Sequence, residues 1–204
     1  MGKELLFEIG TEEIPSGYLP PALEDLKAVA SRLLTEQRLA FTVVRTLGTP
    51  RRLTLFVDGL AERQRDARRE VVGPPKAAAF DADGKPTKAA EGFARAQGVA
   101  LDSVQVRALE RGEYLVAIQE ERGGRTPDVL VGLLPKLLGA LAFPKFMRWG
   151  EGTFRFVRPI RWLLAIYDGR VVPFEVDGLK TDGKTYGHRF LAPRAVRVRN
   201  FQEY

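Results

Sequence analysis

Hydrophobic and polar positions follow two different periods along the chain, and together these periods predict a mixed α+β fold. The short apolar run Leu5–Ile9 is typical of a β-strand. Apolar residues then recur at helical spacing between Pro21 and Gln37, with Ser16 as a candidate N-cap before them. The run Arg52–Val57 alternates residue by residue and predicts a further strand.

The middle of the chain has a weaker pattern. The run Ala61–Glu70 carries charges of both signs, which is typical of a solvated surface helix or a linker. Thr87 is a candidate N-cap for a helix that ends at Gly98. Apolar runs on both sides of Arg111 and Gly112 predict a β-hairpin.

A nearly all-apolar helix is predicted from Thr126 to Leu141, and a helix of this kind is buried. Four later runs predict strands: Phe154–Val157, Ile160–Tyr167, Val171–Val176 and Thr185–Phe190. The fold class that follows is α+β, with mostly antiparallel sheets and packed helices. Residues 1–204 form one such region, or two lobes, 1–62 and 100–204, joined by a helical or loop segment, 63–99.

Composition excludes several kinds of chemistry. The chain has no cysteine and one histidine, so disulfides, zinc bound by cysteine and histidine-rich metal sites are excluded. The net charge is +6, and residues 145–199 contribute +7 of it, so the rest of the chain sums to −1. A basic excess confined to one part of a chain favours a polyanionic partner such as RNA.

Motif searches find no self-sufficient catalytic set. There is no phosphate-binding loop and no nucleophilic serine elbow. The pair Glu12-Glu13 is either an acid/base or magnesium pair, or a complement to a helix N-terminus or a buried anchor. The pair His188-Arg189 is either a half-buried pair closing a sheet or a contact to phosphate or base.

The densest basic stretch runs from Lys145 to Trp162 and interleaves cations with aromatic side chains. Its candidate RNA-contact residues, with the pair above, are Lys145, Arg148, Arg155, Arg158, Arg161, His188 and Arg189. Basic side chains contact phosphates and aromatic rings stack on bases. The alternative is structural: the aromatics face the core of a sheet, and the arginines pair with Glu151, Glu175 or Asp177.

Six blocks, in this order, carry a resemblance to a known family. They are GTEEIP (10–15), TPRRL (49–53), GKPTKAAEGFAR (84–95), KFMRWGEG (145–152), FVRPIRWLL (156–164) and GHRFL (187–191). Together they span nearly the whole chain, and the chain resembles the N-terminal part of the bacterial glycyl-tRNA synthetase β subunit.

The resemblance implies a glycine–tRNA ligase, an aminoacyl-tRNA synthetase that works as an α2β2 assembly and uses ATP with magnesium to charge tRNA with glycine. ATP and glycine are expected on the α subunit, and the β subunit is needed for tRNA and for assembly. The N-terminal part of the β subunit resembles, more distantly, a substrate-side domain of the phenylalanyl-tRNA synthetase β subunit.

The sequence departs from the family pattern in two ways, and these limit which family properties can be assigned to it. The family's β subunits are several times longer, so we expect this chain to be the N-terminal region of a longer protein. Arg155 is followed at position 157 by valine, where the class II arginine motif has an acidic residue, so no ATP site, catalytic residue or metal ligand is assigned.

We expect a cytoplasmic protein without a membrane segment, because the longest apolar runs are far shorter than the roughly 20 residues that a membrane helix needs. The region itself is expected to be noncatalytic and to serve tRNA contact or subunit assembly. The alternative is a free-standing RNA- or protein-binding module.

Overall fold

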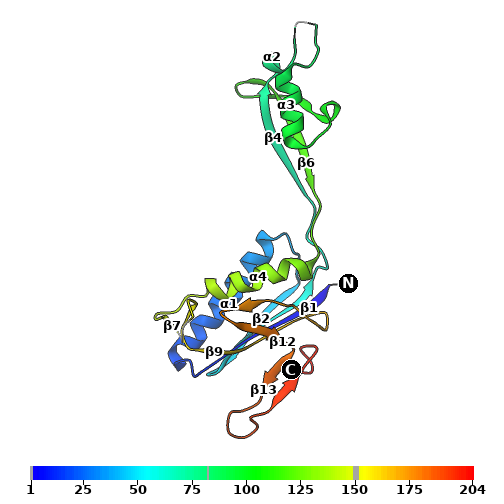
Figure 1. Cartoon of the computed structure of the whole chain (residues 1–204). Helices are drawn as coiled ribbons and strands as arrows, with labels where there is room; N and C mark the ends of the chain where they lie inside the picture. Colours follow the sequence, from blue (N-terminus) through cyan, green and yellow to red (C-terminus); the bar gives the residue numbers. More distant parts are fainter. Residues whose placement is uncertain (1, 82, 149–151) are drawn as a thin grey trace. The chain divides into compact units, whose positions relative to one another are not determined.

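The structure, a computed structural model, describes residues 2–81, 83–148 and 152–204 and divides into two compact units (Figure 1). Unit 1 combines Met1–Arg65 with Gly124–Tyr204, and unit 2 is Asp66–Gly123. These boundaries differ from the two lobes considered above. The reason is that the first strand of the chain pairs with a strand beyond residue 159, so both ends of the chain share one sheet.

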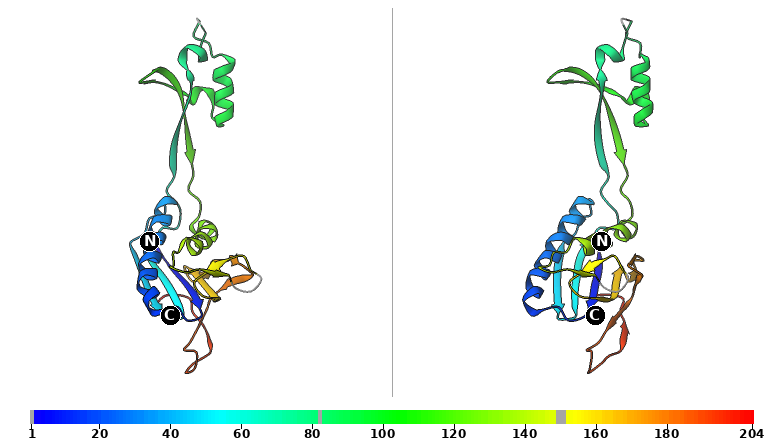
Figure 2. Two further views of the ribbon diagram at one scale, coloured as in Figure 1. Left: turned by 90° about the vertical axis from the view of Figure 1, so that its left-hand side faces the viewer. Right: turned by 60° about the vertical axis from the view of Figure 1, so that its left-hand side comes forward.

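The main sheet of unit 1 has seven strands among the described residues. They are β1 (Lys3–Thr11), β2 (Val43–Thr49), β3 (Arg52–Leu60), β9 (Ile160–Tyr167), β10 (Arg170–Val171), β11 (Glu175–Val176) and β12 (Leu179–Asp182). The order is β11-β12-β9-β1-β3-β2, with β10 beside β9. Figure 2 (right) shows β1 in blue between β3 in cyan and β9 in gold. Of the pairings in the described part of the chain, only that of β12 with β9 is parallel, which confirms a mostly antiparallel sheet.

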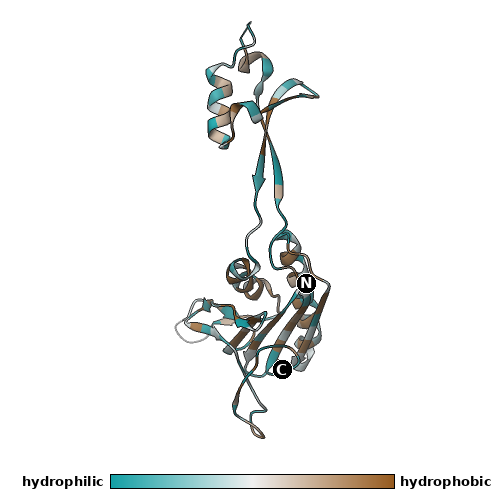
Figure 3. Cartoon of the chain, turned by 90° about the vertical axis from the view of Figure 1, so that its right-hand side faces the viewer, coloured by the Kyte–Doolittle hydropathy of each residue, from teal (hydrophilic) through white to brown (hydrophobic). Residues whose placement is uncertain are grey.

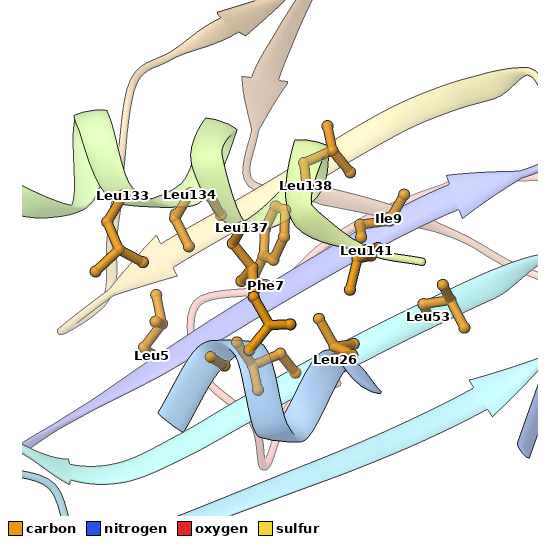
Figure 4. Packing of buried hydrophobic residues seen from close by; sticks show 14 of the residues in the cluster. Leu5, Phe7, Ile9, Leu26, Leu53, Leu133, Leu134, Leu137, Leu138 and Leu141 are labelled. Carbon is orange, nitrogen blue, oxygen red and sulfur yellow. The ribbon is translucent and has the colours of Figure 1, made fainter. Parts of the chain in front are cut away.

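Two helices, α1 (Leu19–Glu36) and α4 (Thr126–Ala140), pack on one face of this sheet. The strand alternation turns Leu5, Phe7 and Ile9 toward them (Figure 4). The predicted burial of the second helix is confirmed, since its leucines fill the space above β1, and α4 is brown over most of its length in Figure 3.

The start of α1 differs from the predicted one. Ser16 does not cap the helix but opens a short 3-10 turn, η1 (Ser16–Tyr18), and Tyr18 takes the N-cap position without a side-chain hydrogen bond. Proline occupies the first turn of α1, where its missing N–H costs nothing.

The opposite face of the sheet is covered by the C-terminal segment. A hairpin of β13 (Lys184–Tyr186) and β14 (Ala195–Arg197) lies on that side (Figure 1). A second apolar cluster joins Leu6 and Leu164 of the sheet to Val198, Phe201 and Tyr204.

Three of the predicted strands are shorter than expected. The run 171–176 gives only β10 and β11, because Pro173 lies between them and has no N–H to donate to a ladder. The run 154–157 gives only β8 (Arg155–Phe156), which pairs with β7 (Met147–Arg148). The run 185–190 gives β13, which ends at Tyr186.

Unit 2 is a three-stranded antiparallel sheet with short helices. Its elements are β4 (Ala67–Pro75), α2 (Lys76–Ala79), α3 (Lys88–Gln97), η2 (Leu101–Ser103), β5 (Gln105–Leu109) and β6 (Gly112–Glu121), with strand order β4-β6-β5. The expected surface helix or linker over residues 61–70 is wrong from Ala67 onward, because this charged run pairs with β6. The caps of α3 are confirmed: the Thr87 hydroxyl accepts from the Ala89 N–H, and Gly98 is left-handed, with φ 65°.

No helix of the described residues is long and apolar enough to span a membrane.

Truncation of Leu137 should destabilise unit 1. Its side chain is fully buried in α4, so Leu137→Ala should lower the free energy of unfolding by about 2–5 kcal/mol, measured by urea denaturation. The matched control is Val131→Ala on the same helix, 38% exposed, which should change stability by less than about 1 kcal/mol. Equal losses in the two variants would contradict the assigned packing of α4.

Candidate nucleic-acid interface

A carboxylate is buried at the centre of the main sheet. Glu8 lies on β1 and is 0% exposed, on the face that Leu6 shares. Its Oε1 accepts hydrogen bonds from Trp162 Nε1 at 2.9 Å and from Thr185 Oγ1 at 3.0 Å. The Arg52 guanidinium lies 3.8 Å from the same oxygen. One glutamate therefore connects β1 to β3, β9 and β13.

Burial of Glu8 favours its protonated form, whereas its polar neighbours favour the carboxylate. Burial raises the pKa of Glu8, while Thr185, Arg52 and Trp162 oppose that rise because each stabilises the carboxylate. Glu8 Oε2 has no hydrogen-bond partner within the described ranges. Burial and the nearby Glu8 charge also raise the pKa of Tyr204, whose hydroxyl lies 2.8 Å from Thr54 Oγ1. We interpret Glu8 as an anchor that holds the C-terminal segment on the sheet.

A second charged group surrounds the turn after β1. Glu12 and Glu13, both at least partly exposed, form the centre of this arginine cluster. Its cations are Arg51, Arg158, Arg161 and Arg189. Arg189 Nη1 lies 2.9 Å from Glu13 Oε1, and Arg161 Nε lies 3.3 Å from Glu12 Oε1. Arg51, Arg161 and Arg189 meet the two carboxylates, whereas Arg158 donates to the Glu13 carbonyl oxygen. The four guanidinium groups and two carboxylates together leave an excess of two positive charges.

The glutamate pair forms ion pairs with surrounding arginines. Across the described residues no three potential metal ligands come together. The two side chains hold arginines rather than complement a helix. The pKa of Glu13 is lowered by a hydrogen bond from its own backbone N–H and by Arg189, so its charged form is favoured beside the arginines.

The arginines around Pro159 pair with other residues than the acidic partners expected from the sequence. Arg158 Nε donates to the Glu13 carbonyl oxygen at 2.9 Å, and Arg161 pairs with Glu12. Of the expected partners, Glu175 pairs with Lys180, and Asp177 Oδ1 accepts from the Thr153 N–H. Glu151 lies outside the described residues.

Three candidate cations lie on or beside the β7–β8 hairpin. Lys145, Arg148 and Arg155 are exposed, and none of them forms an ion pair with another described residue. Arg148 and Arg155 are directly opposite each other in the ladder. Like charges in this position repel each other, so the hairpin presents concentrated positive charge to solvent.

The aromatic side chains of the same stretch point inward. Phe156 and Trp162 are buried, and Phe146 and Phe154 are partly buried against the core. Trp149 lies outside the described residues. For these four rings the structural alternative is confirmed, and base stacking by them is not supported.

The loop of residues 187–194 carries the exposed apolar side chains that sequence reasoning missed. The pair His188-Arg189 does not close a sheet, because both residues lie beyond the end of β13 and are exposed. His188 Nδ1 accepts from the N–H groups of Phe190 and Leu191, at 3.3 and 3.2 Å. Those two side chains are 80% and 84% exposed. The GHRFL block was the sequence feature that could have indicated this exposed loop, but a strand was expected to continue through it.

A pocket of about 290 Å³ opens at the base of this loop. Arg51, Arg161 and Arg189 line it together with Trp162 and Tyr186. Guanidinium groups bind phosphate through paired hydrogen bonds, and an exposed ring such as that of Tyr186 can contact ribose or base. The pocket therefore brings together two of the seven candidate residues, Arg161 and Arg189, whereas Lys145, Arg148 and Arg155 belong to the hairpin surface.

Comparison with known proteins gives one consistent result. The family model described as "Glycyl-tRNA synthetase beta subunit" matches residues 5–204. The chain is 52% identical over its full length to the glycine–tRNA ligase beta subunit of Moorella thermoacetica and covers 29% of that protein. It is 50% identical to the corresponding protein of Desulforudis audaxviator and 48% identical to that of Trichlorobacter lovleyi, covering 30% of each. The chain thus spans less than a third of the length of these relatives.

Replacement of the buried carboxylate should change how stability depends on pH. Because the folded-state pKa of Glu8 is raised above its ordinary value of 4.5, its contribution to stability is complete below that value and is lost as pH rises through the folded-state pKa. Relative to Glu8→Gln, the wild-type protein should therefore lose stability as pH is raised from below 4.5 through the folded-state pKa of Glu8. Urea denaturation at a series of pH values measures this, and a difference that does not vary with pH would contradict it.

Proposed function

Because the chain belongs to the glycyl-tRNA synthetase beta subunit family, we propose that it forms the N-terminal region of the beta subunit of a glycine–tRNA ligase. The whole enzyme uses ATP with magnesium to charge tRNA with glycine, as a cytoplasmic α2β2 assembly. In that assembly this region is noncatalytic and contacts tRNA. In this proposal the region corresponds to a substrate-side domain of the phenylalanyl-tRNA synthetase beta subunit.

The observation that carries tRNA contact is the facing pair of arginines on the β7–β8 hairpin. Arg148 and Arg155 are directly opposite and exposed, and like charges in this arrangement destabilise a β-ladder. A phosphate bound between them would replace this repulsion with two charge-assisted hydrogen bonds. Lys145, also exposed, adds a third positive charge nearby in the sequence.

In this proposal ATP binds to the alpha subunit, and the side chains of this chain are compatible with that placement. Magnesium-bound ATP needs oxygen ligands for the metal and donors for its phosphates. Among the described residues no three candidate metal ligands lie together, and the arginine cluster holds its two carboxylates in ion pairs. These residues do not fit a magnesium–ATP site, so the proposed function involves no chemical step on this chain.

The 204-residue chain alone should lack ligase activity. With purified chain, glycine-dependent exchange of pyrophosphate into ATP should stay at the background rate, and addition of the alpha subunit with a full-length beta subunit is the positive control. Exchange by the isolated chain that depends on glycine would contradict a noncatalytic role.

Loss of one hairpin arginine should reduce the salt dependence of RNA binding. Each phosphate contact to unpaired RNA adds about 0.7 to the slope of log affinity against log salt, so Arg155→Ala should lower that slope by about this amount for every RNA tested. The matched control is Arg32→Ala, an exposed arginine of α1 already paired with Glu36 at 2.8 Å. Its slope should equal that of the wild type, and an unchanged slope in Arg155→Ala would count against the hairpin as a phosphate contact.

A further inference from the structure

We propose that the loop of residues 187–194, with the pocket at its base, binds an unpaired nucleotide of RNA. The base stacks on Phe190, and the adjoining phosphate meets the arginine cluster. This inference rests on the proposed function, because it assumes that the chain contacts tRNA. It adds that one contact recognises an unstacked base rather than duplex backbone.

The loop is held in a single conformation by its own hydrogen bonds. The Gly187 N–H donates to the Arg194 carbonyl oxygen at 3.1 Å, and the Ala192 N–H donates to the His188 carbonyl oxygen at 2.9 Å. A side chain at position 187 would come within 2.2 Å of the Ala192 carbonyl oxygen, so only glycine fits there. His188 Nδ1 also accepts from the N–H groups of Phe190 and Leu191, so hydrogen bonds within the loop support its tip, which carries the exposed apolar side chains.

The exposure of Phe190 is therefore maintained by the loop. Large apolar side chains grouped on a surface mark contact sites. The Arg189 guanidinium lies 5.6 Å from the Phe190 ring centroid, and the His188 ring lies 6.2 Å from it. A ring with a guanidinium group beside it suits a nucleobase next to its phosphate.

The charge of the surrounding surface favours RNA over an apolar pocket of a protein. Arg189 belongs to the arginine cluster, which holds four guanidinium groups and only two carboxylates. Burying this excess charge against an apolar protein surface would be costly. A phosphate satisfies it, and the pocket of about 290 Å³ exposes Arg161 and Arg189 beside Tyr186.

Stacking on Phe190 requires a base whose face is free. Bases in a duplex are stacked on their neighbours, whereas those in loops, bulges and single-stranded ends are not. The site therefore selects unpaired RNA, in contrast to the hairpin arginines, which contact phosphates of either form.

The test compares two variants of the same loop. Phe190→Ala removes the ring, and Leu191→Ala removes a side chain of similar exposure that has no π-face. Titrations of the 204-residue chain use a short fluorescein-labelled single-stranded RNA and a blunt-ended duplex of the same sequence. Phe190→Ala should weaken single-strand binding about tenfold, with the salt slope and duplex binding unchanged, while Leu191→Ala stays close to wild type. Phe190→Trp should bind like the wild type.

Each other outcome overturns the inference in a distinguishable way. Single-strand binding that depends on salt but is equal in wild type and Phe190→Ala removes the stacking site and leaves the proposed tRNA contact standing. If neither RNA binds in a salt-dependent way, both the stacking site and the proposed tRNA contact are contradicted. RNA binding that neither variant changes, with capture of the purified alpha subunit lost in both, assigns the loop to a protein partner. Melting curves of both variants check that they are folded.

Discussion

A carboxylate buried in the middle of a sheet must find hydrogen-bond donors, and in this protein those donors come from three other strands. Glu8 takes one from Trp162 and one from Thr185, with Arg52 at the edge of reach. The requirement ties the C-terminal segment to the face of the sheet that the helices leave open. Because Thr185 lies on β13, the same hydrogen bonds hold β13, and the loop of residues 187–194 that follows it, against the sheet. The surface proposed for RNA depends on this buried group.

The turn after β1 carries two further glutamates, and these orient the arginines that we propose to contact RNA. Glu12 and Glu13 are too few to neutralise the arginines around them, but they are enough to orient them. Side chains held in this way lose less conformational entropy when an anion binds than free surface arginines would. Positive charge on the hairpin is arranged differently, because Arg148 and Arg155 are direct cross-strand neighbours.

Features encoded by local pattern were predictable from sequence, and features that depend on distant pairing were not. The leucine content of α4 predicted its burial, and Gly98 predicted the end of α3. The charged run that became β4 is a strand only because β6 lies beside it. Arg158 and Glu13 are 145 residues apart, and only the pairing of β1 with β9 brings them together. Phe190 was missed because an aromatic residue in an apolar run is usually buried.

The two points at which unit 2 joins unit 1 lie close together, and this affects how easily the length of the protein can change. The Gln64 N–H donates to the Gly124 carbonyl oxygen at 2.9 Å, and Gln64 Oε1 accepts from the Gly124 N–H at 3.0 Å. The chain therefore leaves and re-enters unit 1 at nearly the same point. Seen from unit 1, the whole of residues 66–123 is one loop whose ends are already joined, and the entropy of closing such a loop grows only slowly with its length. Evolution can enlarge, shrink or exchange this insertion while the sheet and the loop it supports stay unchanged.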